Sequence, residues 1–156
     1  MPYISLSTGL RANIAAGYGI SPMLNGGVIH VYQGTPVANA DSAANPDDLL
    51  GTITTDGKVF IPNYDPNDAG LQVQFMPPAS LINVGTWILR VVRAGTATWF
   101  RWRWSYEDPL TASTYYPRLD GSIGTDFDLL VLPTQTLELG YTYPIDSFLL
   151  TLQDTV

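Results

Sequence analysis

Basic and aromatic side chains concentrate in one short stretch of the chain. Four of its seven Lys and Arg residues lie between positions 90 and 103, and positions 99–104 read WFRWRW. A guanidinium group carries five N–H donors in a planar arrangement that matches a carboxylate. Because the whole chain has a formal net charge of −7, this local excess of positive charge predicts that an anionic group packs against it.

The aromatic residues of this stretch allow three interpretations. Stacking on nucleic-acid bases is disfavoured, because a net-acidic chain lacks the clustered Lys and Arg residues that neutralise phosphates. A sugar-binding surface would require that Trp99, Tyr115 and Tyr116 are exposed. We favour the third interpretation, in which alternate aromatic residues form one buried row of a β-sheet.

The other reactive residue types do not form a catalytic pattern. The sequence has no Cys, one His, and none of the common nucleophile, zinc-protease, P-loop or dinucleotide motifs. His30 falls in the middle of a predicted strand and is expected to be a packed strand residue. The run DPNDAG at 65–70 lacks the final glutamate of a calcium loop, so a calcium site is the weaker alternative to a simple turn. We therefore expect no enzymatic activity, no metal site and no cofactor.

Turn residues divide the chain into short segments that alternate like β-strands. We expect one domain over residues 1–156, with an N-terminal helical segment at 1–26 and an antiparallel β-sandwich, jelly-roll-like or immunoglobulin-like, at 27–156. Ser7 or Thr8 is expected to cap a helix that ends near Ala16, and Asp56-Gly57 predicts a hairpin turn. The predicted strands are 27–33, 50–54, 58–62, 71–76, 86–94, 97–106, 128–132 and 145–152.

The two strands that hold the arginines are predicted to form one hairpin around a Gly95-Thr96 turn. One face of it is then apolar, and the other places two arginines directly opposite each other, where like charges repel. The expected anionic group comes either from another molecule or from the acidic loops between residues 41 and 68. The predicted core residues are Trp87, Leu89, Val91, Phe100, Trp102 and Trp104. The predicted partner-binding residues are Arg90, Trp99, Arg101 and Arg103.

Several segments resemble, in the same order along the chain, a family of small structural proteins of tailed bacteriophages and prophages. They are STGLRANIAAGYG at 7–19, LNGGVIHVYQGTPVANADSAANPDDLLGTIT at 24–54, ATWFRW at 97–102, RLDGSIGTDFDLLVL at 118–132 and IDSFLLTL at 145–152. The likeness extends over most of the chain, and none of the segments is a catalytic motif. The Tyr115-Tyr116-Pro117 segment and the acidic loops depart from the family pattern.

The resemblance implies a virion component, and within that class a cement or decoration protein that binds the major capsid protein on the outer surface of the shell. A tail or head-tail connector subunit and a carbohydrate-binding module of an adhesin are the alternatives. The N-terminus lacks a secretory signal, and no segment has the roughly 20 apolar residues that span a bilayer. We therefore expect synthesis in the host cytoplasm, a homo-oligomer on the capsid, and no binding to nucleic acid or membranes.

Overall fold

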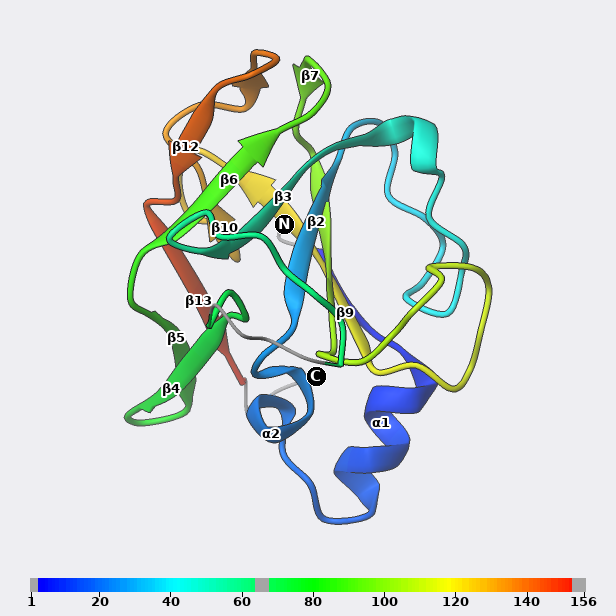
Figure 1. The fold of residues 1–156 in the computed structure, drawn as a ribbon. Helices are drawn as coiled ribbons and strands as arrows, with labels where there is room; N and C mark the ends of the chain where they lie inside the picture. Colours follow the sequence, from blue (N-terminus) through cyan, green and yellow to red (C-terminus); the bar gives the residue numbers. More distant parts are fainter. Residues whose placement is uncertain (1–2, 64–67, 153–156) are drawn as a thin grey trace.

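The computed structural model describes residues 3–63 and 68–152, and most of its regular structure is β-strand (Figure 1). Two short helices, α1 (Thr8–Ala15) and α2 (Ile20–Leu24), and one 3-10 turn, η1 (Pro46–Asp48), accompany the strands. The strands are β1 (Ile4–Leu6), β2 (Val28–Tyr32), β3 (Leu49–Thr55), β4 (Gln72–Met76), β5 (Ser80–Val84), β6 (Trp87–Val91), β7 (Gly95–Thr96), β8 (Trp99–Arg103), β9 (Arg118–Gly124), β10 (Leu130–Val131), β11 (Thr136–Leu137), β12 (Thr142–Pro144) and β13 (Ser147–Thr151).

Among the described residues, eleven strands form one sheet in the order β12-β6-β3-β2-β8-β9-β10-β13-β5-β4, with β1 paired to β9. Neighbouring strands in it are antiparallel, except that β9 and β10 run parallel. The sheet curls so that side chains from the strands at its two ends meet in one core. The fold is therefore all-β with a short N-terminal helix, as predicted.

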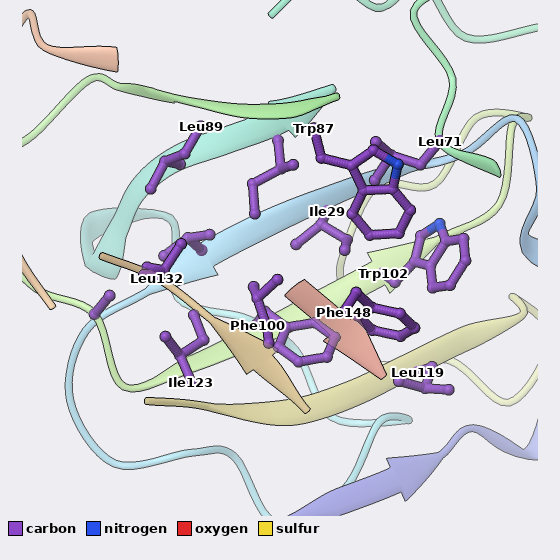
Figure 2. Packing of buried hydrophobic residues seen from close by; sticks show 14 of the residues in the cluster. Ile29, Leu71, Trp87, Leu89, Phe100, Trp102, Leu119, Ile123, Leu132 and Phe148 are labelled. Carbon is purple, nitrogen blue, oxygen red and sulfur yellow. The ribbon is translucent and has the colours of Figure 1, made fainter. Parts of the chain in front are cut away.

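Phe148 on β13 joins the two halves of the curled sheet. Its ring centroid lies 5.3 Å from that of Trp87, 5.5 Å from that of Trp102 and 6.1 Å from that of Phe100. Figure 2 shows these rings close together; Trp87 lies on β6, Phe100 and Trp102 on β8, and Phe148 on β13. Five of the six predicted core residues are buried in this cluster: Trp87, Leu89, Val91, Phe100 and Trp102.

Trp104 differs from the prediction, because it is only partly buried and lies outside the main core. Strand β8 ends at Arg103, so the inward row of alternate residues ends before position 104. The indole ring instead packs edge-to-face against three tyrosine rings near the surface. They are Tyr106, Tyr115 and Tyr116, with centroids 5.0, 6.0 and 6.2 Å from that of Trp104.

The predicted hairpin of residues 86–104 does not form. Strand β6 pairs with β3 and β12, whereas β8 pairs with β2 and β9. The backbone N–H groups of Val92 and Arg93 both donate to the carbonyl of Leu50, and Thr98 N–H donates to the carbonyl of Tyr32. Because of these bonds, the chain after β6 crosses the ends of β3 and β2 and does not form a tight turn. The inward and outward faces are nevertheless as expected, because side-chain alternation is the same whichever strand is the neighbour.

The predicted strand at 58–62 is also absent. Asp56 and Gly57 do form a turn, with positive φ angles of 54° and 69°. The Thr54 hydroxyl then donates to the carbonyl of Lys58 at 2.6 Å, and no ladder follows along 58–62. This segment therefore leaves the sheet and contributes to one wall of the cavity described below.

Strand β9 was not predicted, because its sequence RLDGSIG contains two charged residues and two glycines. Both charged residues, Arg118 and Asp120, are completely buried. Each forms an ion pair inside the chain, Arg118 with Asp108 and Asp120 with Arg101. Strands are usually recognised by alternation between buried apolar residues and exposed polar residues. Buried charges of this kind depart from that alternation, so the strand is missed.

The N-terminal helix begins as the sequence predicts. Ser7 caps α1 by accepting the backbone N–H of Leu10 at 3.1 Å, and the Ser7 hydroxyl donates to the carbonyl of Tyr116 at 2.7 Å. Leu10 is completely buried, which fixes the helix against the sheet. Across residues 3–63 and 68–152, no helix has the length and apolar character needed to cross a membrane.

Candidate functional site

The four predicted partner-binding residues lie on β6 and β8, but they do not form one exposed stripe. The strand register places Arg101, His30, Thr52 and Arg90 in one row across β8, β2, β3 and β6. With about 4.8 Å between neighbouring strands, Arg90 and Arg101 are about 14 Å apart along this row. The direct repulsion expected from the predicted hairpin therefore does not arise.

Arg101 is completely buried, and its anionic partner belongs to the same chain. Its Nε and Nη2 atoms donate to the two carboxylate oxygens of Asp120, directly opposite on β9, at 2.7 and 2.8 Å. Its Nη1 donates to the carbonyl of Ser42 at 2.8 Å. Burial lowers the pKa of Arg101, but its hydrogen bonds to Asp120 and the charges of Asp120 and its other neighbours together raise the pKa overall. Arg101 is therefore not available to a partner, and the carboxylate comes from β9 and not from the acidic loops.

Trp99 is also enclosed, with 2% of its surface exposed. Its ring stacks on Tyr32, with centroids 4.5 Å apart and planes 16° apart, in a small second core that includes Ala44. The segment 33–48 covers this part of the sheet, and it lies beside the segment 105–117 in Figure 1. Trp99 therefore cannot act as an exposed sugar-binding or partner-binding residue.

The outer face over β2, β3 and β6 is hollowed into an open cavity of about 430 Å³. This volume lies within the range of about 300–1,000 Å³ that is typical of small-ligand sites. Three cationic side chains line the cavity, those of Lys58, Arg90 and Arg103, and no Asp or Glu does. The remaining wall is largely apolar: Val28, Val59, Phe60, Pro62 and Val92. The cavity therefore combines positive charge with apolar surface.

Arg103 is the most deeply placed of the three cations, with 7% of its surface exposed. Its Nη1 donates to the carbonyl of Tyr106 at 2.8 Å, and its Cζ lies 5.0 Å from the ring centroid of Phe60. Within the described part of the chain, no carboxylate is close enough to form an ion pair with it. Burial lowers the pKa of Arg103. The charges of Asp108 and Glu107 raise this pKa, but they do not offset the effect of burial. A buried guanidinium without a directly bonded carboxylate is costly, so this group favours an added anion.

Arg103 also fixes the protonation state of His30. Its Nε can only donate, so His30 Nε2, 3.1 Å away, accepts the bond and the neutral imidazole carries its proton on Nδ1. Within residues 3–63 and 68–152, this buried Nδ1 has no hydrogen-bond partner. Burial, followed by the charge of Arg103, lowers the pKa of His30 from 6.5 to about 3. His30 therefore remains neutral beside the cavity at neutral pH.

Replacing His30 with Gln is expected to reduce the acid sensitivity of the fold. An unfolded chain protonates His30 near pH 6.5, whereas the folded chain does so only near pH 3. The contribution of neutral His30 is thus complete above pH 6.5 and is lost as the pH falls, at about 1.4 kcal/mol per pH unit. Urea titrations of both chains from pH 7 to pH 4 measure this slope. Equal slopes would show that His30 titrates normally in the folded protein.

Arg90 and Lys58 supply exposed positive charge at the cavity. Arg90 Nε donates to the carbonyl of Gly57, which ties the turn at 56–57 to β6. Lys58 Nζ lies 4.0 Å from a carboxylate oxygen of Asp56, and both side chains are exposed. Exposed pairs of this kind are weak. Both cations can therefore interact with an anionic group that enters the cavity.

The structure divides the predicted site and adds residues that the sequence did not indicate. Arg90 and Arg103 remain at one cavity, whereas Trp99 and Arg101 belong to the interior. Lys58 was not expected there, because 58–62 was predicted as a strand. The run at 65–70, for which a calcium loop was the weaker alternative to a turn, falls largely outside the described residues. In the described ranges, no three His, Asp or Glu side chains are grouped closely enough to hold a metal ion.

The resemblance to phage structural proteins rests on the sequence motifs alone. Comparisons of the chain with protein-family models, with curated proteins and with solved structures find no match.

Proposed function

We propose that the chain is a structural protein of a bacteriophage virion, of the cement or decoration class. In this proposal it binds the major capsid protein and its own copies through the basic cavity. The observation that carries the proposal is Arg103, a buried guanidinium that meets no carboxylate of the described residues. A carboxylate from a neighbouring subunit would offset the cost of burying this charge. The sequence resemblance supports a role in the virion, and the cavity is the surface through which the proposed contact is made.

Apolar residues around the cations support a protein partner. Val59 and Val92 both line the cavity, and 68% and 61% of their surfaces are exposed. Contact with a neighbouring subunit would remove this apolar surface from water and strengthen the adjacent ion pairs. Arginine beside exposed apolar residues is a common composition for a protein interface.

Charge reversal at Arg90 is expected to reduce attachment to particles at least ten-fold, because it replaces attraction for a carboxylate with repulsion. Arg93→Glu is the matched control, since Arg93 is exposed and close in sequence but does not line the cavity. Occupancy is measured by quantitative mass spectrometry of purified particles, with circular dichroism to confirm folding. Lys58→Glu provides a second cavity variant that leaves the hydrogen bond from Arg90 to Gly57 intact. Equal occupancy of all variants, or absence of the wild-type chain from particles, would count against the proposal.

A further inference from the structure

The loop between β9 and β10, residues 125–129, presents an apolar ring flanked by acidic residues. Phe127 is 89% exposed, the highest value among the large apolar residues of the described chain. Its backbone has a φ of 53°, which is unfavourable for a bulky residue. Asp126 precedes it and is exposed as well. A strained backbone at an exposed aromatic residue lowers the stability of the fold, and such strain is common at functional sites.

The base of this loop is held in place by its own contacts. The Asp128 carboxylate accepts a hydrogen bond from the hydroxyl of Ser122. Leu130 and Val131 pair in parallel with Ile123 and Gly124, so the loop starts and ends on adjacent strands. Phe127 is therefore presented on an anchored loop. A preorganised loop loses less conformational freedom when it binds than a flexible one.

We propose that the Asp126-Phe127 tip of one copy inserts into the basic cavity of the next copy. The cavity presents Arg103 and Arg90 to an anionic group, and Asp126 brings a carboxylate. Its wall is largely apolar, and Phe127 brings an exposed ring. A cavity of ~150 Å³ holds a benzene ring, so the observed cavity of about 430 Å³ has room for the phenylalanine side chain. This inference rests on the proposed use of the cavity as a docking site.

Electrostatics favour this contact over other contacts between two copies. Each chain carries a formal net charge of −7, so two copies repel each other over most orientations. The cavity gathers three of the seven Lys and Arg side chains, and an acidic loop is attracted there. An inserted ring would also meet the guanidinium of Arg103, which already packs on Phe60. Because loop and cavity are different surfaces, the contact can repeat from copy to copy.

Sedimentation of the purified full chain tests the proposal. The wild type is expected to self-associate as its concentration rises. Phe127→Asn removes the ring but tolerates the positive φ, and Arg90→Glu disables the cavity. Each variant alone is expected to raise the dissociation constant at least ten-fold. Mixed together they are expected to form a one-to-one dimer, because one partner keeps its cavity and the other keeps its loop.

Tyr115→Ser and Arg93→Glu are the matched controls for a lost exposed ring and a lost exposed cation, and both are expected to associate like the wild type. A wild type that stays monomeric, or variants that fail to complement each other when mixed, would overturn the inference. If the chain is monomeric but Arg90→Glu still reduces particle occupancy, the proposed function stands and the loop is not the occupant. If Arg90→Glu leaves occupancy unchanged, the proposed function itself fails.

Discussion

Replacing Asp120 with Asn is expected to lower the free energy of unfolding by about 3–5 kcal/mol, the usual cost of removing one member of a buried ion pair. Arg101 and Asp120 are both completely buried and share two short hydrogen bonds. Asn keeps the shape of the side chain but leaves the guanidinium without its counter-charge. The backbone carbonyl of Ser42 cannot neutralise that charge, although it accepts one hydrogen bond.

Chemical denaturation monitored by circular dichroism measures this loss. Asp56→Asn is the control, because it removes an exposed ion pair with Lys58 and Asn tolerates the positive φ at this position. That change is expected to cost about 1 kcal/mol or less. If both variants lose the same small amount, the pair of Arg101 and Asp120 does not hold the outer face of the sheet together.

Truncation of Phe148 to Ala is expected to cost about 3–5 kcal/mol, as for other completely buried phenylalanines. The ring contacts Trp87, Phe100 and Trp102, which lie on the opposite half of the curled sheet. Its removal deletes these aromatic contacts and leaves a cavity that rigid strands cannot close. Because two of the contacts are tryptophans, fluorescence during urea unfolding reports directly on this region.

Phe75→Ala is the control for the same chemical deletion at a site that is 65% exposed. It is expected to change the free energy of unfolding by less than about 1 kcal/mol, since little buried surface is lost. A loss at Phe148 no larger than that at Phe75 would show that the two halves of the sheet are not joined through this residue.

Local patterns in the sequence predicted several features of the fold. Ser7 caps the first helix, and β2, β3 and β8 lie where turn residues and alternating side chains placed strands. The burial of Trp102 and Phe100 followed from alternation alone, because the inward face of a strand does not depend on its neighbours. These features are set by interactions within a few residues.

Features that depend on distant parts of the chain could not be predicted. The Gly95-Thr96 dipeptide suggested a hairpin, but Leu50 and Tyr32, more than 40 positions upstream, redirect the connection. The buried partner of Arg101 lies on β9, a strand that the sequence did not reveal because its charged residues are buried beneath the segment 33–48. The basic cavity depends on the same long-range pairing. Arg90 on β6 and Arg103 on β8 reach the same cavity only because β3 and β2 pair between their strands.

A high-resolution reconstruction of particles that carry the chain will reveal whether the basic cavity holds a carboxylate of a neighbouring subunit, as we claim. We expect density for an acidic side chain of another subunit between Arg90 and Arg103, with Val59 and Val92 covered. A cavity that faces only solvent in the assembled particle, with every contact made elsewhere on the chain, would contradict the claim.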